Sequence, residues 1–309
     1  MNKTLIIIAG PTAAGKTALA IQIAKHFNTE IISADSRQFY REMNIGTAKP
    51  SKEELEVIPH HLIDSHSIVD SFSVGDFEKE VINLLEKLFK SKDQIVLVGG
   101  SGLFINAICN GFDVLPVATE AIRSELNKLL AEKGIAYLQE KLKKADPQYY
   151  VEVDVNNPQR LIRALEVFES TGNPFSSYRT KSPKKRNFKI IKLGINPIRE
   201  KLYEQINLRV DQMVQLGLFE EVKGLIEYRQ LNTLNTVGYS EIFEYIDGKL
   251  SKEAAIDKIK QNTRRFAKRQ ITWFKKSEDM NWFEANELSA ILGFLDAAMN
   301  VRSNADQKN

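Results

Sequence analysis

The chain has 309 residues, of which 43% are apolar, and its 43 Lys and Arg against 40 Asp and Glu give a net charge of +3. This length suggests about two domains, and the near balance of charge excludes a strongly basic nucleic-acid-binding protein, so any RNA contact must come from local clusters. The single cysteine, Cys109, excludes an internal disulfide framework, and no stretch approaches the roughly 20 apolar residues of a membrane span. We expect a globular, cytoplasmic protein that does not contact membranes.

The first 27 residues predict a strand, a loop and a helix. Residues 4–9 are an apolar run typical of a buried strand, and residues 17–27 predict the helix. The residues between them satisfy the phosphate-loop pattern G-x-x-x-x-G-K-[ST]. Backbone amides of such a loop hold phosphates, Lys16 adds positive charge, and the hydroxyl of Thr17 can reach a Mg²⁺ ion bound to the same phosphates. The candidate diphosphate-binding residues are Gly10, Pro11, Thr12, Ala13, Ala14, Gly15, Lys16 and Thr17.

A second short strand, residues 30–34, places Asp35 at its C-terminal end, the edge of an open α/β sheet where ligands bind. Asp35 is therefore a candidate Mg²⁺ ligand or general base, and the alternative is a helix or turn cap. The loop that follows could line the same site through Thr47 and Lys49. His60 and His61 do not predict a metal site, because adjacent residues of an extended chain point to opposite sides.

Residues 76–90 predict an amphipathic crossover helix, and residues 95–98 predict a third buried strand that runs into a glycine-rich turn at residues 99–102. Strands that alternate with helices predict an α/β fold with a doubly wound parallel sheet, similar to that of P-loop NTPases. The third strand lacks the terminal acid that many phosphate-loop hydrolases use, which argues against an ATPase or GTPase.

Residues 116–186 contain no comparable apolar strand and predict an all-helical insertion, so the catalytic core would comprise residues 1–115 and 187–309. Within the insertion, the spacing predicts helices over residues 120–133, 135–144 and 158–171.

In the last of these helices, Leu161 and Leu165 share one face, and Gln159, Arg160 and Arg163 lie on the other. That charged face predicts either a solvated surface or a contact with RNA. The basic segment that ends the insertion, residues 181–189, is also able to touch a phosphate backbone.

After a strand over residues 188–195, residues 197–216 predict a helix whose apolar stripe contains one cation. Leu202, Ile206, Arg209 and Met213 follow each other at i, i+4, i+7 and i+11. A guanidinium in a buried stripe is costly unless it meets an anion. We favour Arg209 as a clamp for a ligand phosphate over an internal salt bridge.

Residues 252–276 predict a long amphipathic helix. Its apolar face would bury Ala255, Ile259, Phe266 and Trp273, and basic residues lie largely on the other face. Such a basic face either engages phosphates of a nucleic acid or is simply solvated.

Seven segments, in this order, resemble the bacterial tRNA dimethylallyltransferase (tRNA isopentenyltransferase) family from about residue 4 to 285. They are GPTAAGKT at residue 10, DSRQFY at 35, NIGTAKP at 44, HHLID at 60, GGSGLF at 99, NPQRLIRALE at 157 and AKRQITWF at 267. The phosphate loop alone would not select among many enzymes, whereas the ordered set is specific.

The resemblance implies transfer of a dimethylallyl group from dimethylallyl diphosphate to N6 of adenosine 37, 3′ to the anticodon, in tRNAs that read codons starting with U. It implies Asp35 as general base and Lys16, Thr17 and Arg209 as groups that hold the diphosphate with Mg²⁺. The positions that match tRNA contacts are Asp35, Ser36, Arg37, Gln38, Ser101, Arg123, Gln159, Arg160, Leu161, Ile162 and Arg163. We expect a monomer whose insertion grips the anticodon stem-loop.

Three positions depart from the family pattern: Ser101 and Phe104 replace Thr and Tyr, and Gln205 stands where many relatives have Arg. The alternative functions are a phosphate-loop kinase of small molecules and an RNA-binding protein that uses the loop as a nucleotide switch.

Overall fold

The computed structural model describes residues 3–113, 115–179 and 182–300. The chain divides into two compact units, one made of Met1–Cys109 and Lys185–Asn309 and the other of Asn110–Lys184. These limits differ by a few residues from the predicted insertion, 116–186. Within the described ranges, every helix is too short or too polar to cross a bilayer.

The larger unit, which we call the core, contains a six-stranded sheet with the strand order β3-β2-β4-β1-β5-β6. All neighbouring strands are parallel, which confirms the predicted doubly wound α/β fold. The edge strands β3 and β6 escaped prediction because, with two and four residues, they are too short for a periodic pattern. The strands are β1 (Thr4–Ala9), β2 (Ile31–Ser33), β3 (His60–His61), β4 (Gln94–Gly99), β5 (Lys189–Ile195) and β6 (Met280–Phe283).

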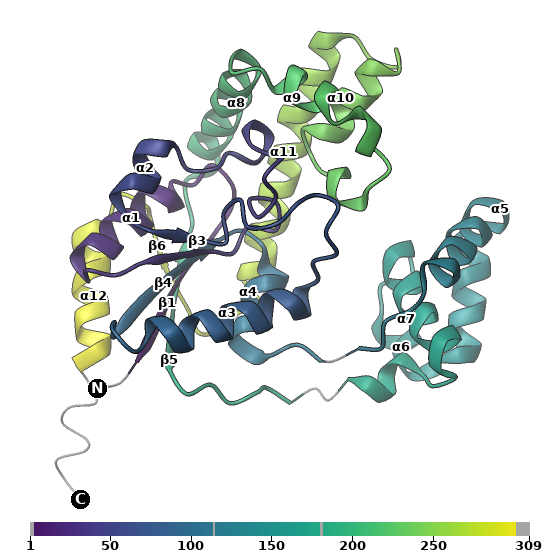
Figure 1. The fold of residues 1–309 in the computed structure, drawn as a ribbon, viewed down its shortest axis with the longest axis horizontal. Coiled ribbons are helices and arrows are strands. Elements are labelled where there is room, and N and C mark those ends of the chain that lie inside the picture. Colours follow the sequence, from purple (N-terminus) through teal and green to yellow (C-terminus); the bar gives the residue numbers. More distant parts are fainter. Residues whose placement is uncertain (1–2, 114, 180–181, 301–309) are drawn as a thin grey trace, which may run out of the picture. The chain divides into compact units, whose positions relative to one another are not determined.

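Helices cover both faces of this sheet (Figure 1). Ile6 and Ile8 of β1 pack with α1 (Lys16–His26) and α12 (Leu288–Asn300). Leu5 and Ile7 point to the opposite face and pack with α3 (Val74–Leu88) and α4 (Gly102–Asn110). Because both faces are covered, β1 is apolar without alternation, as its sequence indicated.

Four helices beside the sheet form a further apolar cluster in the core. They are α8 (Arg199–Gln215), α9 (Leu218–Gly224), α10 (Tyr239–Ile246) and α11 (Lys252–Phe274). The prediction that Phe266 and Trp273 are buried is wrong: these side chains are 40% and 41% exposed. The helix buries Ala267, Gln270 and Phe274 there instead.

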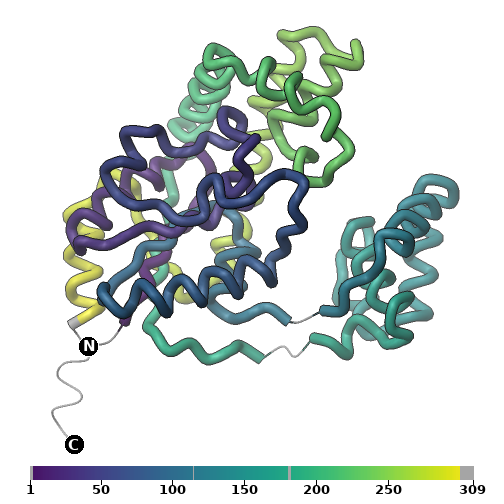
Figure 2. Tube along the Cα trace, viewed as in Figure 1, coloured from purple at the N-terminus to yellow at the C-terminus, as the bar shows by residue number. Residues whose placement is uncertain are grey.

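The smaller unit is all helical, as predicted, and Figure 2 traces the chain into it after α4 and back toward β5. Its helices are α5 (Glu120–Ala145), α6 (Pro147–Glu152) and α7 (Pro158–Thr171). Gly134 interrupts α5 at φ 74°, a left-handed value that favours glycine. Asn157 caps α7 by accepting the Arg160 amide at 3.2 Å, and Gly172 ends it, so the predicted helix limits are confirmed.

The basic segment before β5 is used partly by the fold. Lys181 lies outside the described residues. The Arg186 side chain is 11% exposed. Its guanidinium donates to the carbonyl oxygens of Ala107 and Ile108, each at 2.7 Å, and pairs with Glu78 at 2.7 Å. Arg186 therefore ties the end of α4 to α3 and is not available to an RNA backbone, whereas Lys185 of the same segment is exposed.

Substituting Gly99 with Ala is expected to lower the free energy of unfolding by about 1–3 kcal/mol, because the new methyl group would overlap the Ala34 carbonyl where β4 and β2 end. Gly293→Ala is the matched control: a Cβ there meets nothing within 4 Å, and alanine should stabilise α12 by about 0.5–1 kcal/mol. Urea denaturation measures both. Equal stabilities of the two variants would contradict the close approach.

Candidate active site

A cavity of about 590 Å³ lies where the loops after β1, β2 and β4 meet α8, the segment leading into α10, and α11. All of its lining residues belong to the core. The predicted site residues that it brings together are Thr12, Lys16, Thr17, Asp35, Ser36, Arg37, Gln38, Ser101 and Arg209. Gly10 and Pro11, which precede Thr12, and Ala13, Ala14 and Gly15, which follow it, are not among the lining residues. The predicted insertion residues belong to the other unit.

The phosphate loop has a backbone that only particular residues tolerate. Gly15 has φ 79°, a left-handed value, directly before α1 begins. A Cβ on Gly10 would lie 2.8 Å from the carbonyl oxygen of Ile195, so β5 approaches the loop too closely for a side chain. Both glycines of the motif are therefore required by geometry as well as by ligand access.

Lys16 projects from the loop and its ammonium donates to the Pro11 carbonyl oxygen at 2.6 Å. Burial lowers the pKa of Lys16 to about 8; Asp35 opposes this shift and Arg209 adds to it. These electrostatic interactions place two cations and a carboxylate in one neighbourhood. A buried cation with a lowered pKa is stabilised by an arriving anion.

Asp35 caps a turn and also lines the cavity. Its Oδ1 accepts the Arg37 amide at 2.9 Å, which is a turn cap. In the described part of the chain Oδ2 accepts no hydrogen bond, and the side chain lines the cavity. One carboxylate oxygen thus fixes the local turn and leaves the other able to take a proton.

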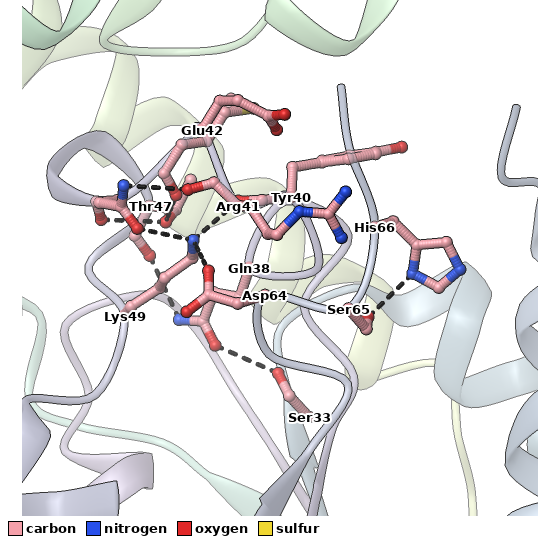
Figure 3. Close-up of polar contacts among 12 residues, drawn as sticks. Ser33, Gln38, Tyr40, Arg41, Glu42, Thr47, Lys49, Asp64, Ser65 and His66 are labelled. Atoms are coloured by element: carbon pink, nitrogen blue, oxygen red, sulfur yellow. Dashed lines mark hydrogen bonds and ion pairs between the residues drawn. The ribbon is translucent and has the colours of Figure 1, made fainter. Parts of the chain in front are cut away.

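Hydrogen bonds hold the segment after Asp35 against its neighbours. The Ser101 hydroxyl oxygen accepts the Ser36 amide at 3.0 Å, which joins the loops after β2 and β4. Gln38 accepts from the Ser33 hydroxyl at 3.1 Å and donates to the carbonyl oxygens of Thr47 and Ala48, each at 3.2 Å (Figure 3). Gln38 thereby shapes the wall that Thr47 contributes to the cavity.

Lys49 does not line the cavity, contrary to the expectation from its loop. Its ammonium contacts Asp64, the Tyr40 carbonyl oxygen at 2.7 Å and the Asn44 side-chain oxygen at 2.9 Å (Figure 3). Three oxygen acceptors satisfy the three donors of the ammonium. Lys49 therefore stabilises this loop.

Arg209 lines the cavity from α8 and is half-buried. Burial lowers the pKa of its guanidinium, an effect that Glu54 opposes from a distance. Among the described residues no ion pair or hydrogen bond of Arg209 is present, so the internal salt bridge considered as its alternative role is not found. A partly desolvated cation facing a cavity is suited to binding an anion.

Glu221 is a residue that no sequence pattern singled out. Its Oε2 accepts the amides of Asn44 and Ile45 at 3.0 and 2.7 Å, and its Oε1 accepts the Gly46 amide at 3.0 Å and the Tyr239 hydroxyl at 2.6 Å. Burial, followed by the Glu221 charge, raises the pKa of Tyr239, which keeps this hydroxyl a donor. One carboxylate of α9 therefore fixes the loop that forms a cavity wall.

The predicted RNA-contacting residues of the insertion differ in exposure. Arg123 and Arg163 pair with the buried Glu166 at 2.7 and 3.3 Å. Leu161 and Ile162 are fully buried in the apolar cluster of the insertion, so their side chains cannot meet a ligand. Gln159 and Arg160 are exposed.

A family model described as IPP transferase matches residues 38–277, more than half of the chain. The chain belongs to the IPP transferase family. A tRNA dimethylallyltransferase of Christiangramia forsetii is 52% identical over 97% of this chain and 100% of its own length. The tRNA dimethylallyltransferase of Cytophaga hutchinsonii is 45% identical over 97% of this chain and 98% of its own length.

Solved structures of IPP transferase relatives share the fold. The full-length tRNA isopentenylpyrophosphate transferase of Bacillus halodurans is 37% identical, with a TM-score of 0.73 and 99% of each chain covered. A eukaryotic dimethylallyltransferase acting on tRNA is 27% identical, with a TM-score of 0.77, over 98% of this chain and 80% of that one.

The lowered pKa of Lys16 predicts a pH dependence of anion binding. Lys16 is cationic below its folded pKa of about 8, so the affinity for inorganic diphosphate should fall as pH rises through that value. Calorimetric titrations between about pH 7 and 9.5 measure the affinity, and Lys16→Ala corrects for titration of the ligand itself. A wild-type profile parallel to that of Lys16→Ala would contradict the assignment.

Glu221→Gln is expected to loosen the loop at residues 44–46, because one amide group cannot replace the four hydrogen bonds that the carboxylate accepts. The free energy of unfolding should fall by about 1–3 kcal/mol, and hydrogen exchange of the three loop amides should accelerate. Glu220→Gln, an exposed neighbour, is the control. Unchanged exchange in Glu221→Gln would show that the carboxylate does not hold the loop.

Proposed function

We propose that the chain is a tRNA dimethylallyltransferase, which transfers a dimethylallyl group from dimethylallyl diphosphate to N6 of adenosine 37 in tRNAs that read codons starting with U. The observation that carries the proposal is the cavity, where Lys16, Asp35 and Arg209 line one space in a member of the IPP transferase family. Two cations suit a diphosphate, and a carboxylate suits a nucleophile that must lose a proton.

The leaving group is the diphosphate itself. The bond between C1 of the dimethylallyl group and the bridging oxygen breaks, and that oxygen leaves with the diphosphate. Lys16, Arg209 and the amides of the phosphate loop stabilise the negative charge that develops there, which makes the allylic carbon electrophilic. The proposal therefore gives the phosphate loop the task of neutralising a leaving group rather than transferring a phosphoryl group.

The residues present fit a Mg²⁺ ion that is held mainly by the substrate. Thr17 lines the cavity beside Lys16, and Mg²⁺ in phosphate sites commonly takes one or two protein oxygens together with phosphate oxygens. Within the described ranges no group of three or more His, Cys, Asp or Glu side chains is placed to hold a metal. The Thr17 hydroxyl would contribute to holding the ion, which would supply further neutralisation of the diphosphate.

Asp35 is the proposed general base. N6 of adenine is a poor nucleophile, because its lone pair is delocalised into the ring. As the N6–C1 bond forms, the nitrogen must lose a proton, and Oδ2 of Asp35 is the atom able to accept it. The hydrogen bond from the Arg37 amide to Oδ1 keeps the carboxylate oriented.

The acceptor base must leave the stack of the anticodon loop to enter a cavity, at a cost of a few kcal/mol. Ser36, Arg37, Gln38 and Ser101 line the cavity and are the proposed contacts of the inserted nucleotide and its neighbours. In the insertion, the exposed Gln159 and Arg160 are proposed to grip the anticodon stem-loop, while Arg123 and Arg163 would do so only with the part of each guanidinium that Glu166 leaves accessible.

The test is to incubate the protein with undermodified tRNA, Mg²⁺ and radiolabelled dimethylallyl diphosphate in the absence of ATP. Label entering the tRNA supports the proposal. A requirement for ATP with release of ADP would indicate the kinase alternative, and tRNA binding without label transfer would indicate an RNA-binding switch.

Asp35→Asn should lower the single-turnover rate of prenyl transfer by about 10² to 10⁴ and change tRNA affinity little. Asparagine preserves the size of the side chain and its acceptor for the Arg37 amide, so the comparison isolates the loss of the base. Rapid quenching with labelled donor measures the rate. A variant that turns over as fast as the wild type would remove Asp35 as the base.

A further inference from the structure

Glu166 of α7 is a buried carboxylate in the smaller unit. Its side chain is 3% exposed, and its chain neighbours Leu165 and Val167 are fully buried. Oε2 accepts a hydrogen bond from Nη1 of Arg163 at 3.3 Å, and Oε1 forms an ion pair with Nε of Arg123 at 2.7 Å. A buried carboxylate is costly unless it is paired, so these two guanidiniums offset its desolvation.

The two arginines come from different helices, and Glu166 is their common partner. Arg163 precedes Glu166 by three residues, which places the two side chains next to each other on α7. Arg123 stands near the start of α5. Nη2 of Arg163 also donates to the Pro116 carbonyl oxygen at 3.2 Å, in the segment that leads into α5. Glu166 therefore fixes two long side chains at the junction of α5 and α7.

Both arginines remain accessible. Their side chains are 44% and 34% exposed, for Arg123 and Arg163 respectively. A guanidinium has five N–H donors, and among the residues that the structure describes the two Nη atoms of Arg123 have neither a hydrogen bond nor an ion pair. Four donors of a planar cation are thus free to bind phosphate oxygens, a geometry that suits two parallel hydrogen bonds.

Preorganisation and net charge predict opposite effects of the Glu166 carboxylate on RNA binding. Folding alone does not require this group, because buried ion pairs often stabilise no more than apolar side chains of the same size. Side chains that are ordered before RNA arrives lose less freedom on binding, so the carboxylate would strengthen binding. If only net charge mattered, its negative charge would weaken binding to a phosphate backbone.

We infer that Glu166 is a positioning residue, which holds Arg123 and Arg163 together as one binding element for phosphates of an RNA backbone. This inference rests on the proposed function, which gives the insertion the task of gripping the anticodon stem-loop. It adds the residue through which the two arginines are held before the RNA binds.

The test compares the affinities of Glu166→Gln and Glu169→Gln for an unmodified tRNA transcript that reads a codon starting with U, measured by fluorescence anisotropy at one ionic strength. Both variants lose one negative charge from α7. Glu169 is the matched control, because it also joins α7 to α5, through Lys141 at 3.0 Å. Glu166→Gln should bind about tenfold more weakly, the cost of ordering long side chains on binding, whereas Glu169→Gln should bind as well as the wild type or better.

A double-variant cycle separates positioning from a general structural role. In a protein that carries Arg123→Ala and Arg163→Ala, adding Glu166→Gln should cause no further loss of tRNA affinity, because the groups through which Glu166 acts are gone. If Glu166→Gln does not fold, Arg123→Lys serves. Lysine keeps the charge, but its single ammonium cannot pair with Glu166 and also offer a planar fork, so this variant should bind about as weakly as Arg123→Ala.

Three results would overturn the inference: a Glu166→Gln variant that binds tRNA as tightly as Glu169→Gln, an equal loss with and without the two arginines, or an Arg123→Lys variant that binds like the wild type. Any of these, found in a protein whose wild type still transfers label to tRNA, would leave the proposed function intact. A wild type that neither binds the transcript nor transfers label would overturn both.

Discussion

The site depends on close approach of backbone at the carboxyl edge of a parallel sheet. β1, β2 and β4 end at the same edge of the sheet. Glycines stand at the ends of β1 and β4, where a Cβ would overlap Ile195, Ala34 or Gln270. This packing sets the phosphate loop, the turn at Asp35 and the loop at Ser101 around one cavity. Residues that are distant in sequence therefore share a site because their strands are parallel neighbours.

Partly desolvated cations make the cavity suited to binding an anion. Burial lowers the pKa values of Lys16, Arg37 and Arg209, so each of these cations is partly desolvated. The negative charge of Asp35 opposes the lowering of the Lys16 pKa. Such an arrangement is stabilised when an anion enters, and it favours the negative charge that a departing diphosphate acquires. The side-chain oxygen of Gln270 in α11 accepts the Thr12 amide at 2.9 Å beside this cavity.

The sequence predicted the parts of the site that local rules determine. The phosphate loop follows from a motif in a strand-loop-helix context, Asp35 from its place after a strand, and Arg209 from the stripe of its helix. Gln270 and Glu221 could not be found in this way, because Gln270 acts on a residue 258 positions away and Glu221 on a loop about 175 positions away. Helical periodicity also placed Phe266 and Trp273 in the core, because it gives the spacing of residues on a face but not which face the neighbouring elements cover. Family resemblance marked residues 159–163 as a tRNA-contacting segment, but the side chains of Leu161 and Ile162 within it are fully buried.

In the proposed reaction the phosphate loop holds a leaving group, so the bond between C1 of the donor and its oxygen breaks and the phosphorus–oxygen bonds remain intact. Dimethylallyl diphosphate labelled with ¹⁸O at the oxygen between C1 and phosphorus tests this directly. After transfer to undermodified tRNA, mass spectrometry of the products should find the label in the released diphosphate. Recovery of the label in dimethylallyl alcohol or in a product bonded through that oxygen would show that the diphosphate is not the leaving group.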